Sequence, residues 1–414
     1  MMRYNRYWEF LNAVVGGLIS LVLAMTIGRN GDAQRPKNSR KRNRIRNRKY
    51  ALEEMELMSD NHFRRMFRMS REAFHNLEQR LAEKFGDSDF DQAAVNSSGS
   101  TICQRTRLAC ALRWLAGGSY IDICFEFGVS PGSFYADEGV LWGTLEQIDC
   151  LLTIGFPFDD HHALRHIADG FAHYSHHVLK NCVLAIDGWV CHTRQPTAFE
   201  TQFPSSYRNR HNCFGIVVLA GCDADCRFLM FSCKSAGSTN DIVAWDISEM
   251  KHLLDSGALP PQFYFIGDEA FQNTSQFLVP WSGRGLNPWR DSFNYHLSAM
   301  RQCIERAFAL MTQRYGVFWR MLRCDFSRWS LVCSVAAKLH NYCIDMKEGK
   351  ACDILPRLDQ DHVEDDFHFV LDNANLGPEV AGPAKGDTRR NLTDDLCRDG
   401  SRRRRHAQHN SKCL

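Results

Sequence analysis

The sequence predicts an α/β protein in which a mixed sheet follows an α-helical region. Two apolar runs are typical of buried strands, and each leads into an aspartate: residues 183–186 precede Asp187, and residues 262–266 precede Gly267 and Asp268. Upstream, residues 51–147 place apolar side chains at helical spacing between capping residues and glycines. An acid that follows a buried strand lies where open α/β sheets place ligand sites.

The composition limits the classes of protein to which the chain can belong. Its 414 residues are enough for two to three domains, and 44% hydrophobic with 24% charged residues are the values of an ordinary globular protein. The net charge is only +2, so affinity for polyanions has to come from local clusters. The 17 cysteines include no Cys-x-x-Cys pair, which predicts reduced thiols in the cytosol or nucleus.

Residues 1–50 combine an apolar segment with a basic arm. The 18 residues that begin at Leu11 and end at Gly28 are uncharged and mostly apolar, and three readings stay open: a signal peptide, a membrane anchor, or a misassigned start. Residues 35–49 then carry nine Lys or Arg and no acid, as nuclear-import and nucleic-acid-binding arms do. We expect a partly disordered arm with Arg42 and Arg44 as candidate DNA contacts, in a protein of the nucleus and cytoplasm.

Residues 51–150 are predicted to form a helical domain with a helix-turn-helix outline. Phe63 and Phe67 recur at helical spacing, and Ser70 has the position of an N-cap. Glycines and a capping serine then separate three further helices, with a proline at the first position of the last. These helices are expected over residues 105–116, 120–127 and 131–147.

The third of these helices has an unusual composition for a reader of DNA bases. Residues 131–147 contain no Lys or Arg and carry acids such as Asp137 and Glu138, whereas recognition helices usually present Arg, Lys, Asn or Gln. Base-specific readout and a purely structural helical hairpin therefore both stay open. Arg105 and Arg107, on the first of the three helices, are the candidate DNA contacts of this domain.

Residues 151–180 are predicted to form a histidine-rich linking helix. Six histidines fall between positions 161 and 177, and four of them can share one helical face. A zinc site needs a closed set of ligands with supporting hydrogen bonds, which this pattern does not supply. We expect surface histidines rather than a metal cluster.

The next segments continue the sheet that begins before Asp187. Residues 213–220 and 227–233 are typical of antiparallel strands joined by a tight polar turn. A helix is then expected from Asp241 to about residue 254, followed by the strand that ends at Asp268. Two buried strands that each deliver an aspartate at the same kind of position are not a common coincidence.

A helix expected over residues 295–315 supplies a third carboxylate. Glu305 lies about 100° around the helix from the apolar Ile304, at the edge of the buried face, and Arg301 and Arg306 flank it. An i,i+4 ion pair between Arg301 and Glu305 is the plainer alternative. The order of strands, helices and acids is the outline of an RNase H-like nuclease core, which we place at residues 181–347.

The chain resembles the PIF/Harbinger-type DDE transposases over roughly residues 50–345. The resemblance rests on the order and spacing of short motifs, none of which is specific alone. It departs from the family pattern at Glu269 and Ala309, neither of which belongs to the acid triad. The matching motifs are Ala185-Ile-Asp-Gly188, Tyr207-Arg-Asn-Arg210, Gly237-Ser-Thr-Asn-Asp241, Gly267-Asp-Glu-Ala-Phe271, Val279-Pro280, Phe293-Asn-Tyr-His296 and Ile304-Glu-Arg306.

The resemblance implies a nuclease that cuts and joins DNA with two divalent metal ions, Mg²⁺ or Mn²⁺. It implies that Asp187 bridges both ions, that Asp268 holds one and that Glu305 holds the other, with Asp241 as an outer-shell candidate. The implied partners are DNA with terminal inverted repeats, a Myb-like DNA-binding protein and a second copy of the chain. Further candidate DNA contacts are Arg210, Arg301 and Arg306.

Two other functions stay open from the sequence. One is a domesticated, catalytically inactive DNA-binding or adaptor protein that keeps the triad as a relic. The other is an RNase H-fold hydrolase that acts on RNA or another phosphate ester. Residues 348–414 are polar, first acidic and then rich in Gly, Asp and Arg, so we expect this tail to be mostly disordered.

Overall fold

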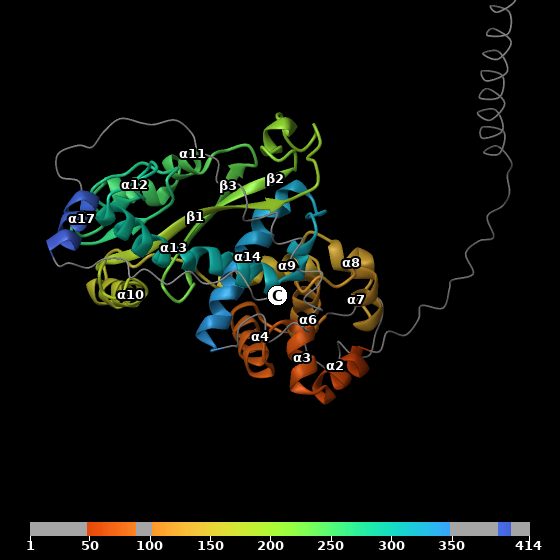
Figure 1. The fold of residues 1–414 in the computed structure, drawn as a ribbon. Coiled ribbons are helices and arrows are strands. Elements are labelled where there is room, and N and C mark those ends of the chain that lie inside the picture. The colour runs from red at the N-terminus through yellow and green to blue at the C-terminus, as the bar shows by residue number, and fades with distance from the viewer. Residues whose placement is uncertain (1–47, 88–101, 348–387, 399–414) are drawn as a thin grey trace, which may run out of the picture. The chain divides into compact units, whose positions relative to one another are not determined.

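The computed structural model describes residues 48–87, 102–347 and 388–398 (Figure 1). The apolar segment after Leu11 and the basic arm with Arg42 and Arg44 lie outside the described residues, as does most of the tail. Within the described ranges, no helix is long and apolar enough to cross a membrane.

The helical region is built from short helices with capped starts. Ser59 accepts a hydrogen bond from the His62 amide and Ser70 accepts one from the Ala73 amide, so the predicted cap at Ser70 is confirmed. Phe63 and Phe67 pack on Phe74, with ring centroids 4.7–5.4 Å apart. The helices are α2 (Arg48–Leu57), α3 (Asp60–Phe67), α4 (Arg71–Phe85), α6 (Gln104–Leu115), α7 (Tyr120–Glu126), α8 (Pro131–Tyr135) and α9 (Val140–Leu151).

The prediction of one continuous helix over residues 131–147 is wrong. Ser130 does cap a helix, but α8 ends at Tyr135 and α9 begins at Val140. Between them Gly139 approaches the backbone so closely that a Cβ there would lie 2.5 Å from the Ser133 carbonyl oxygen. The break leaves α8 with five residues, and α9 follows as a separate helix of 12 residues.

Five strands form the mixed sheet that the sequence predicts, in the order β3-β2-β1-β4-β5. β1 pairs antiparallel with β2 and parallel with β4, which in turn pairs parallel with β5. Strand β1 continues five residues beyond Asp187, so this acid is not at the strand's end as expected. The strands are β1 (Cys182–His192), β2 (Gly215–Cys222), β3 (Phe228–Ala236), β4 (Tyr264–Ile266) and β5 (Phe277–Leu278).

Helices cover both faces of the sheet. Helices α13 (Pro288–Arg314) and α14 (Trp329–Asp345) pack on one face, and α10 (His161–Tyr174), α11 (Asp241–Asp246) and α12 (Glu249–Asp255) pack on the other. The helix expected from Asp241 to residue 254 is divided, because Ser248 caps α12 as a separate helix. The predicted buried face of α13 is confirmed, since Ile304 and its apolar neighbours are fully buried.

One hydrophobic core joins the helical region to the α13 and α14 face of the sheet. Helix α14 packs against both α9 and β3, and its Tyr342 hydroxyl donates to the Ala73 carbonyl at 2.7 Å. Asn341 on the same helix exchanges two hydrogen bonds with the Phe228 backbone. His340 precedes Asn341 in the same helix. Burial lowers the pKa of His340 to about 4, so it is a neutral core residue.

Part of the tail forms a described helix, α17 (Thr388–Arg398), which packs against α13. The Arg389 guanidinium lies 3.9 Å from the Trp281 ring centroid, and the Trp281 indole donates to Thr393 at 3.0 Å. These contacts were not predicted, because their sequence shows only a polar, charged stretch.

Candidate active site

Asp187 and Asp268 lie side by side because of the strand register. In the parallel pairing of β1 with β4, Ala185 is opposite Ile266. Each aspartate is two residues beyond that pair, so both lie at the same level where β4 ends. Asp268 then turns the chain, accepting a hydrogen bond from the Ala270 amide at 3.0 Å. The two acids that the sequence singled out are therefore brought together.

Asp241 approaches the same position from the other side of β1. It is the first residue of α11, and its carboxylate fills the space where residue 188 has no side chain. A Cβ on Gly188 would lie only 2.0 Å from Asp241 Oδ1. Because side chains alternate along a strand, Asp187 faces α13 while Asp241 covers the opposite face at Gly188.

Glu305 reaches Asp187 only through an arginine. Arg301 on α13 places Nη1 at 3.0 Å from Asp187 Oδ2 and Nη2 at 2.7 Å from Glu305 Oε1. The Asp187 side chain is 18% exposed and that of Glu305 is 38% exposed. The predicted i,i+4 pair is thus present, and the same guanidinium also holds the strand carboxylate.

The site carries more negative than positive charge in a partly dry environment. Burial raises the pKa of Asp187 to about 7; Arg301 opposes this, while Asp268 and Asp241 add to it. Burial also raises the pKa of Asp241 to about 6, with Asp268 adding to the rise and Arg210 opposing it. One close arginine does not neutralise the site.

These carboxylates have the donor chemistry of a divalent-cation site. Mg²⁺ and Mn²⁺ prefer hard oxygen ligands, and the raised pKa of Asp187 reports a buried carboxylate next to other acids. Among the residues that the structure describes, no three His, Cys, Asp or Glu side chains are already arranged around one ion. Asp187 and Asp268 fit a divalent cation as they are placed. Glu305 can join them only when Arg301 releases the Glu305 carboxylate.

The remaining candidate residues are distributed over the structure. Arg210 lies close enough to Asp241 to influence its pKa. The Arg306 guanidinium lies 4.9 Å from the Tyr174 ring centroid. Arg107 is half-buried and donates to the carbonyls of residues 102 and 139, which occupies much of its hydrogen-bonding capacity in the fold.

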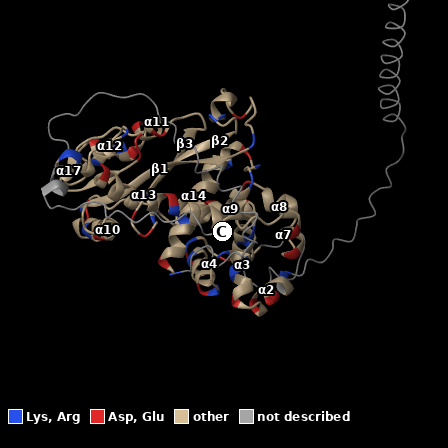
Figure 2. Cartoon of the chain, viewed as in Figure 1, with Lys and Arg blue, Asp and Glu red and all other residues tan. Residues whose placement is uncertain are grey.

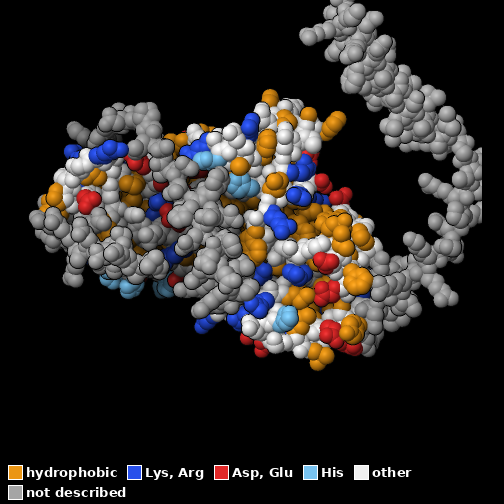
Figure 3. Space-filling model, turned by 45° about the vertical axis from the view of Figure 1, so that its right-hand side comes forward, with side chains coloured by type: hydrophobic (Ala, Val, Ile, Leu, Met, Phe, Trp, Pro, Cys, Tyr) orange, Lys and Arg blue, Asp and Glu red, His pale blue; other side chains and the backbone are white. Residues whose placement is uncertain are grey.

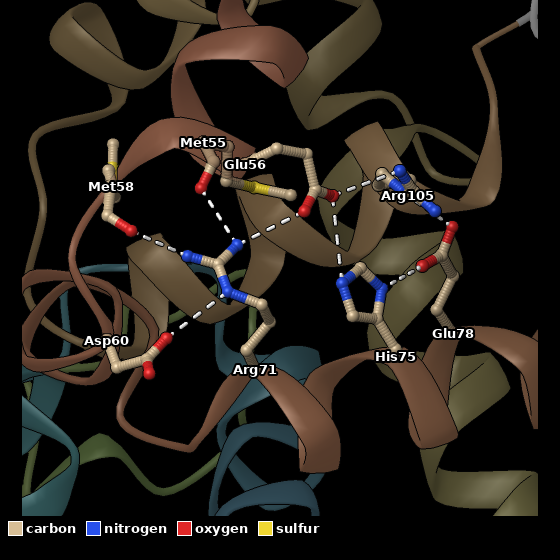
Figure 4. Close-up of polar contacts among 8 residues, drawn as sticks. All are labelled: Met55, Glu56, Met58, Asp60, Arg71, His75, Glu78 and Arg105. Atoms are coloured by element: carbon tan, nitrogen blue, oxygen red, sulfur yellow. Dashed lines mark hydrogen bonds and ion pairs between the residues drawn. The ribbon is translucent and has the colours of Figure 1, made fainter.

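Arg105 belongs to a second charged cluster, which the sequence did not reveal (Figure 4). It joins α2, α4 and α6 through Glu56 and Glu78, with Arg105 bonds of 3.1 Å and 2.8 Å to the two acids. The His75 ring lies between the same two carboxylates, 3.6 Å and 3.0 Å away. Arg71 adds a 3.2 Å bond to Glu56 and donates to two backbone carbonyls.

The fold and the acids together define an RNase H-like core. Residues 186–341 match a protein family described as DDE superfamily endonuclease. This stretch of the chain is therefore similar to a DDE superfamily endonuclease domain, and it includes Asp187, Asp268 and Glu305. Comparisons with curated proteins and with solved structures gave no match.

Proposed function

We propose that this protein is a metal-dependent DNA endonuclease of the PIF/Harbinger transposase type, with Asp187, Asp268 and Glu305 as its catalytic acids. The observation that carries the proposal is the register of β1 and β4, which aligns Asp187 with Asp268 inside the matched segment. Two bound Mg²⁺ or Mn²⁺ ions would supply an activated water or 3′-hydroxyl and stabilise the leaving oxygen of a phosphodiester.

The chain's own residues then have separate roles. Asp187 and Asp268 would hold the metal ions at the end of β4, and burial of Asp187 makes its carboxylate poorly solvated until an ion binds. Asp241 closes the opposite face at Gly188 and acts on the site through its charge. Arg301 bonds both Asp187 and Glu305 in the metal-free protein and has to release them when ions bind.

The partners belong to the same proposal. The substrate is DNA that carries terminal inverted repeats, in the nucleus, and a Myb-like protein and a second copy of the chain assist. The acid-bearing α8 and α9 segment supports a separate DNA reader, since its exposed side chains include Asp137 and Glu138. Arg328 bonds Asp137 at 3.0 Å, which gives that acid a role within the fold.

The test is strand cleavage of an oligonucleotide with the inverted repeats that flank the gene, in Mn²⁺ or Mg²⁺. We expect the unaltered chain to cut and Asp187→Ala to lose about four orders of magnitude in rate, as removal of a group at the reacting atoms does. Undiminished cleavage by Asp187→Ala would sink the assignment of the site.

A domesticated, inactive protein is the second candidate function. It is favoured by one observation, the Arg301 bridge that keeps Glu305 from the two aspartates. This alternative predicts that the unaltered chain binds the same DNA yet cuts it in neither Mg²⁺ nor Mn²⁺. Electrophoresis of the bound DNA after incubation distinguishes the two.

A further inference from the structure

Two exposed phenylalanines lie on the connection between β1 and β2. In this β1–β2 loop, residues 193–214, the exposed fraction of Phe199 is 103% and that of Phe203 is 69%. Figure 1 shows the loop, with its short turn Pro204–Tyr207, beyond the end of the sheet. One exposed ring is ordinary, but two rings four residues apart on one loop offer an apolar surface to a partner.

The loop is held in one shape although its rings are exposed. Glu200, next to Phe199, accepts hydrogen bonds from Arg194 at 2.8 Å, from the Thr197 amide at 2.9 Å and from the Phe326 amide at 3.2 Å. These bonds lower the pKa of Glu200, first through Arg194, so the carboxylate stays charged. The Ser206 hydroxyl donates to the Phe203 carbonyl at 2.7 Å. Both ring positions are therefore preorganised.

The loop also lies against the segment that leads to the active site. The Ser238 amide donates to the Ser206 carbonyl at 2.9 Å, and a Cβ on Gly237 would lie 2.4 Å from the Tyr207 carbonyl oxygen. Three residues later the same segment places Asp241 against Gly188. The base of the loop is thus connected to the segment that carries Asp241.

Charge on the loop selects a polyanion. Glu200 is its one acid and is paired with Arg194, while Arg208 and Arg210 are exposed. Lys, Arg and exposed hydrophobic side chains intermingle on one face of the molecule in Figure 3. Phe125 on α7 is also 71% exposed, but it is flanked by Glu126 and lies one turn from Asp122. Aromatic rings among arginines suit nucleic acid. The ring on α7 instead lies beside acidic side chains, which repel a nucleic acid.

We propose that the β1–β2 loop binds unpaired DNA bases, with Phe199 and Phe203 stacking on bases and Arg208 and Arg210 contacting phosphates. The proposal rests on the proposed function only in naming DNA as the polyanion. Stacking on aromatic rings is sequence-tolerant, because every base presents a flat face. The loop would therefore recognise an opened strand end rather than a particular sequence.

The test compares two fluorescent DNA duplexes of one sequence, blunt or with a four-nucleotide single-stranded end, by anisotropy in EDTA so that neither is cut. We expect the unaltered chain to prefer the single-stranded end. The double variant Phe199→Ala, Phe203→Ala should lose roughly tenfold in affinity for that end and less than about twofold for the blunt duplex. Equal losses on both duplexes, or no loss on either, would overturn the proposal.

The control variant is Phe125→Ala, which removes an equally exposed ring from acidic surroundings and should leave both affinities unchanged. The double variant Phe199→Tyr, Phe203→Tyr keeps two stacking rings and should keep the preference. Because binding is measured in EDTA, its result is separate from cleavage. Lost cleavage with a kept preference contradicts the proposed function alone, whereas cleavage with no loop effect contradicts this inference alone.

Discussion

The two charged clusters of this protein are built from the same residue types and reach opposite electrostatic results. In the helical region, Arg71, Arg105 and His75 surround Glu56 and Glu78, so each carboxylate has at least two partners (Figure 4). Lys, Arg, Asp and Glu all occur on α2, α3 and α4 in Figure 2. The first cluster is a balanced network of the kind that holds helices together.

The site at the end of β4 is not balanced in this way. Asp187, Asp241 and Asp268 interact with one another, and Arg301 is the one arginine bonded to Asp187 among the described contacts. The pKa of Asp187, near 7, shows that folding buries this carboxylate beside other acids, where its charged form is unfavourable. The difference teaches that acids buried next to one another, rather than each paired with several cations, indicate a candidate functional site.

Binding of a divalent metal ion is expected to change the free energy of unfolding more than any of the substitutions below. We expect Mn²⁺ at a hundred times its dissociation constant to raise the free energy of unfolding by about 2.7 kcal/mol, because it binds only the folded site. Asp187→Asn should abolish the gain, and Glu78→Gln in the balanced network should keep it. Thermal or urea unfolding with and without Mn²⁺ measures both. A gain that survives in Asp187→Asn would place the ion elsewhere.

Breaking the charged cluster around Glu78 should change the free energy of unfolding by slightly less than metal binding does. We expect Glu78→Ala to lower the free energy of unfolding by about 2 kcal/mol, because it removes the charged partner of Arg105 and His75. Glu83 on the same helix bonds only a glutamine and is exposed, so Glu83→Ala is the matched control with a loss below about 0.5 kcal/mol. Equal losses in urea titrations would contradict the distinction.

Removing the buried charge of Asp187 should raise the free energy of unfolding, whereas removing that of Glu78 lowers it. We expect Asp187→Asn to stabilise the metal-free protein at pH 8 by on the order of 1–2 kcal/mol. Between about pH 4 and 7 the folded carboxyl binds a proton that the unfolded chain releases, so its contribution to stability falls as pH rises through about 7. The advantage of the variant should therefore grow from pH 5 to pH 8 in urea titrations, and a constant difference would contradict the raised pKa.

The smallest effect concerns the arginine bridge. If Arg301 competes with metal for Asp187 and Glu305, Arg301→Gln should tighten Mn²⁺ binding a few fold, corresponding to less than about 1 kcal/mol. The gain is small because the Glu305 end of the bridge is half-exposed and screened by water. Calorimetric titration measures it, with Arg306→Gln as the control on the same helix. Weaker binding in Arg301→Gln would show that the arginine organises the site.

Much of the fold could be predicted from local pattern. The apolar runs before Asp187 and Asp268 gave the central strands, and the spacing around Ile304 gave the buried face of α13. The breaks at Gly139 and Ser248 were missed, although a glycine and a capping serine are local signals for a helix boundary. Apolar spacing continues across both positions, so spacing alone does not show where one helix ends and the next begins.

The candidate site was predictable as a set of acids and not as a geometry. Asp187, Asp268 and Glu305 were named from the sequence, and the register confirms that the first two lie together. The dual role of Arg301 was missed, since its i,i+4 spacing from Glu305 indicates only one of its two bonds. Phe199 and Phe203 were missed as well, because exposure is not readable from a loop sequence.

The core shared by the helical region and the sheet has a consequence for how such a protein can evolve. Asp149 at the end of α9 bonds Ser334 and Lys338 of α14, and Tyr342 bonds the backbone of α4. A recombination event that replaced the first 150 residues alone would leave α14 facing a foreign surface. Changes in the helical region must therefore arise by point changes within one inherited unit rather than by exchange of a ready-made module.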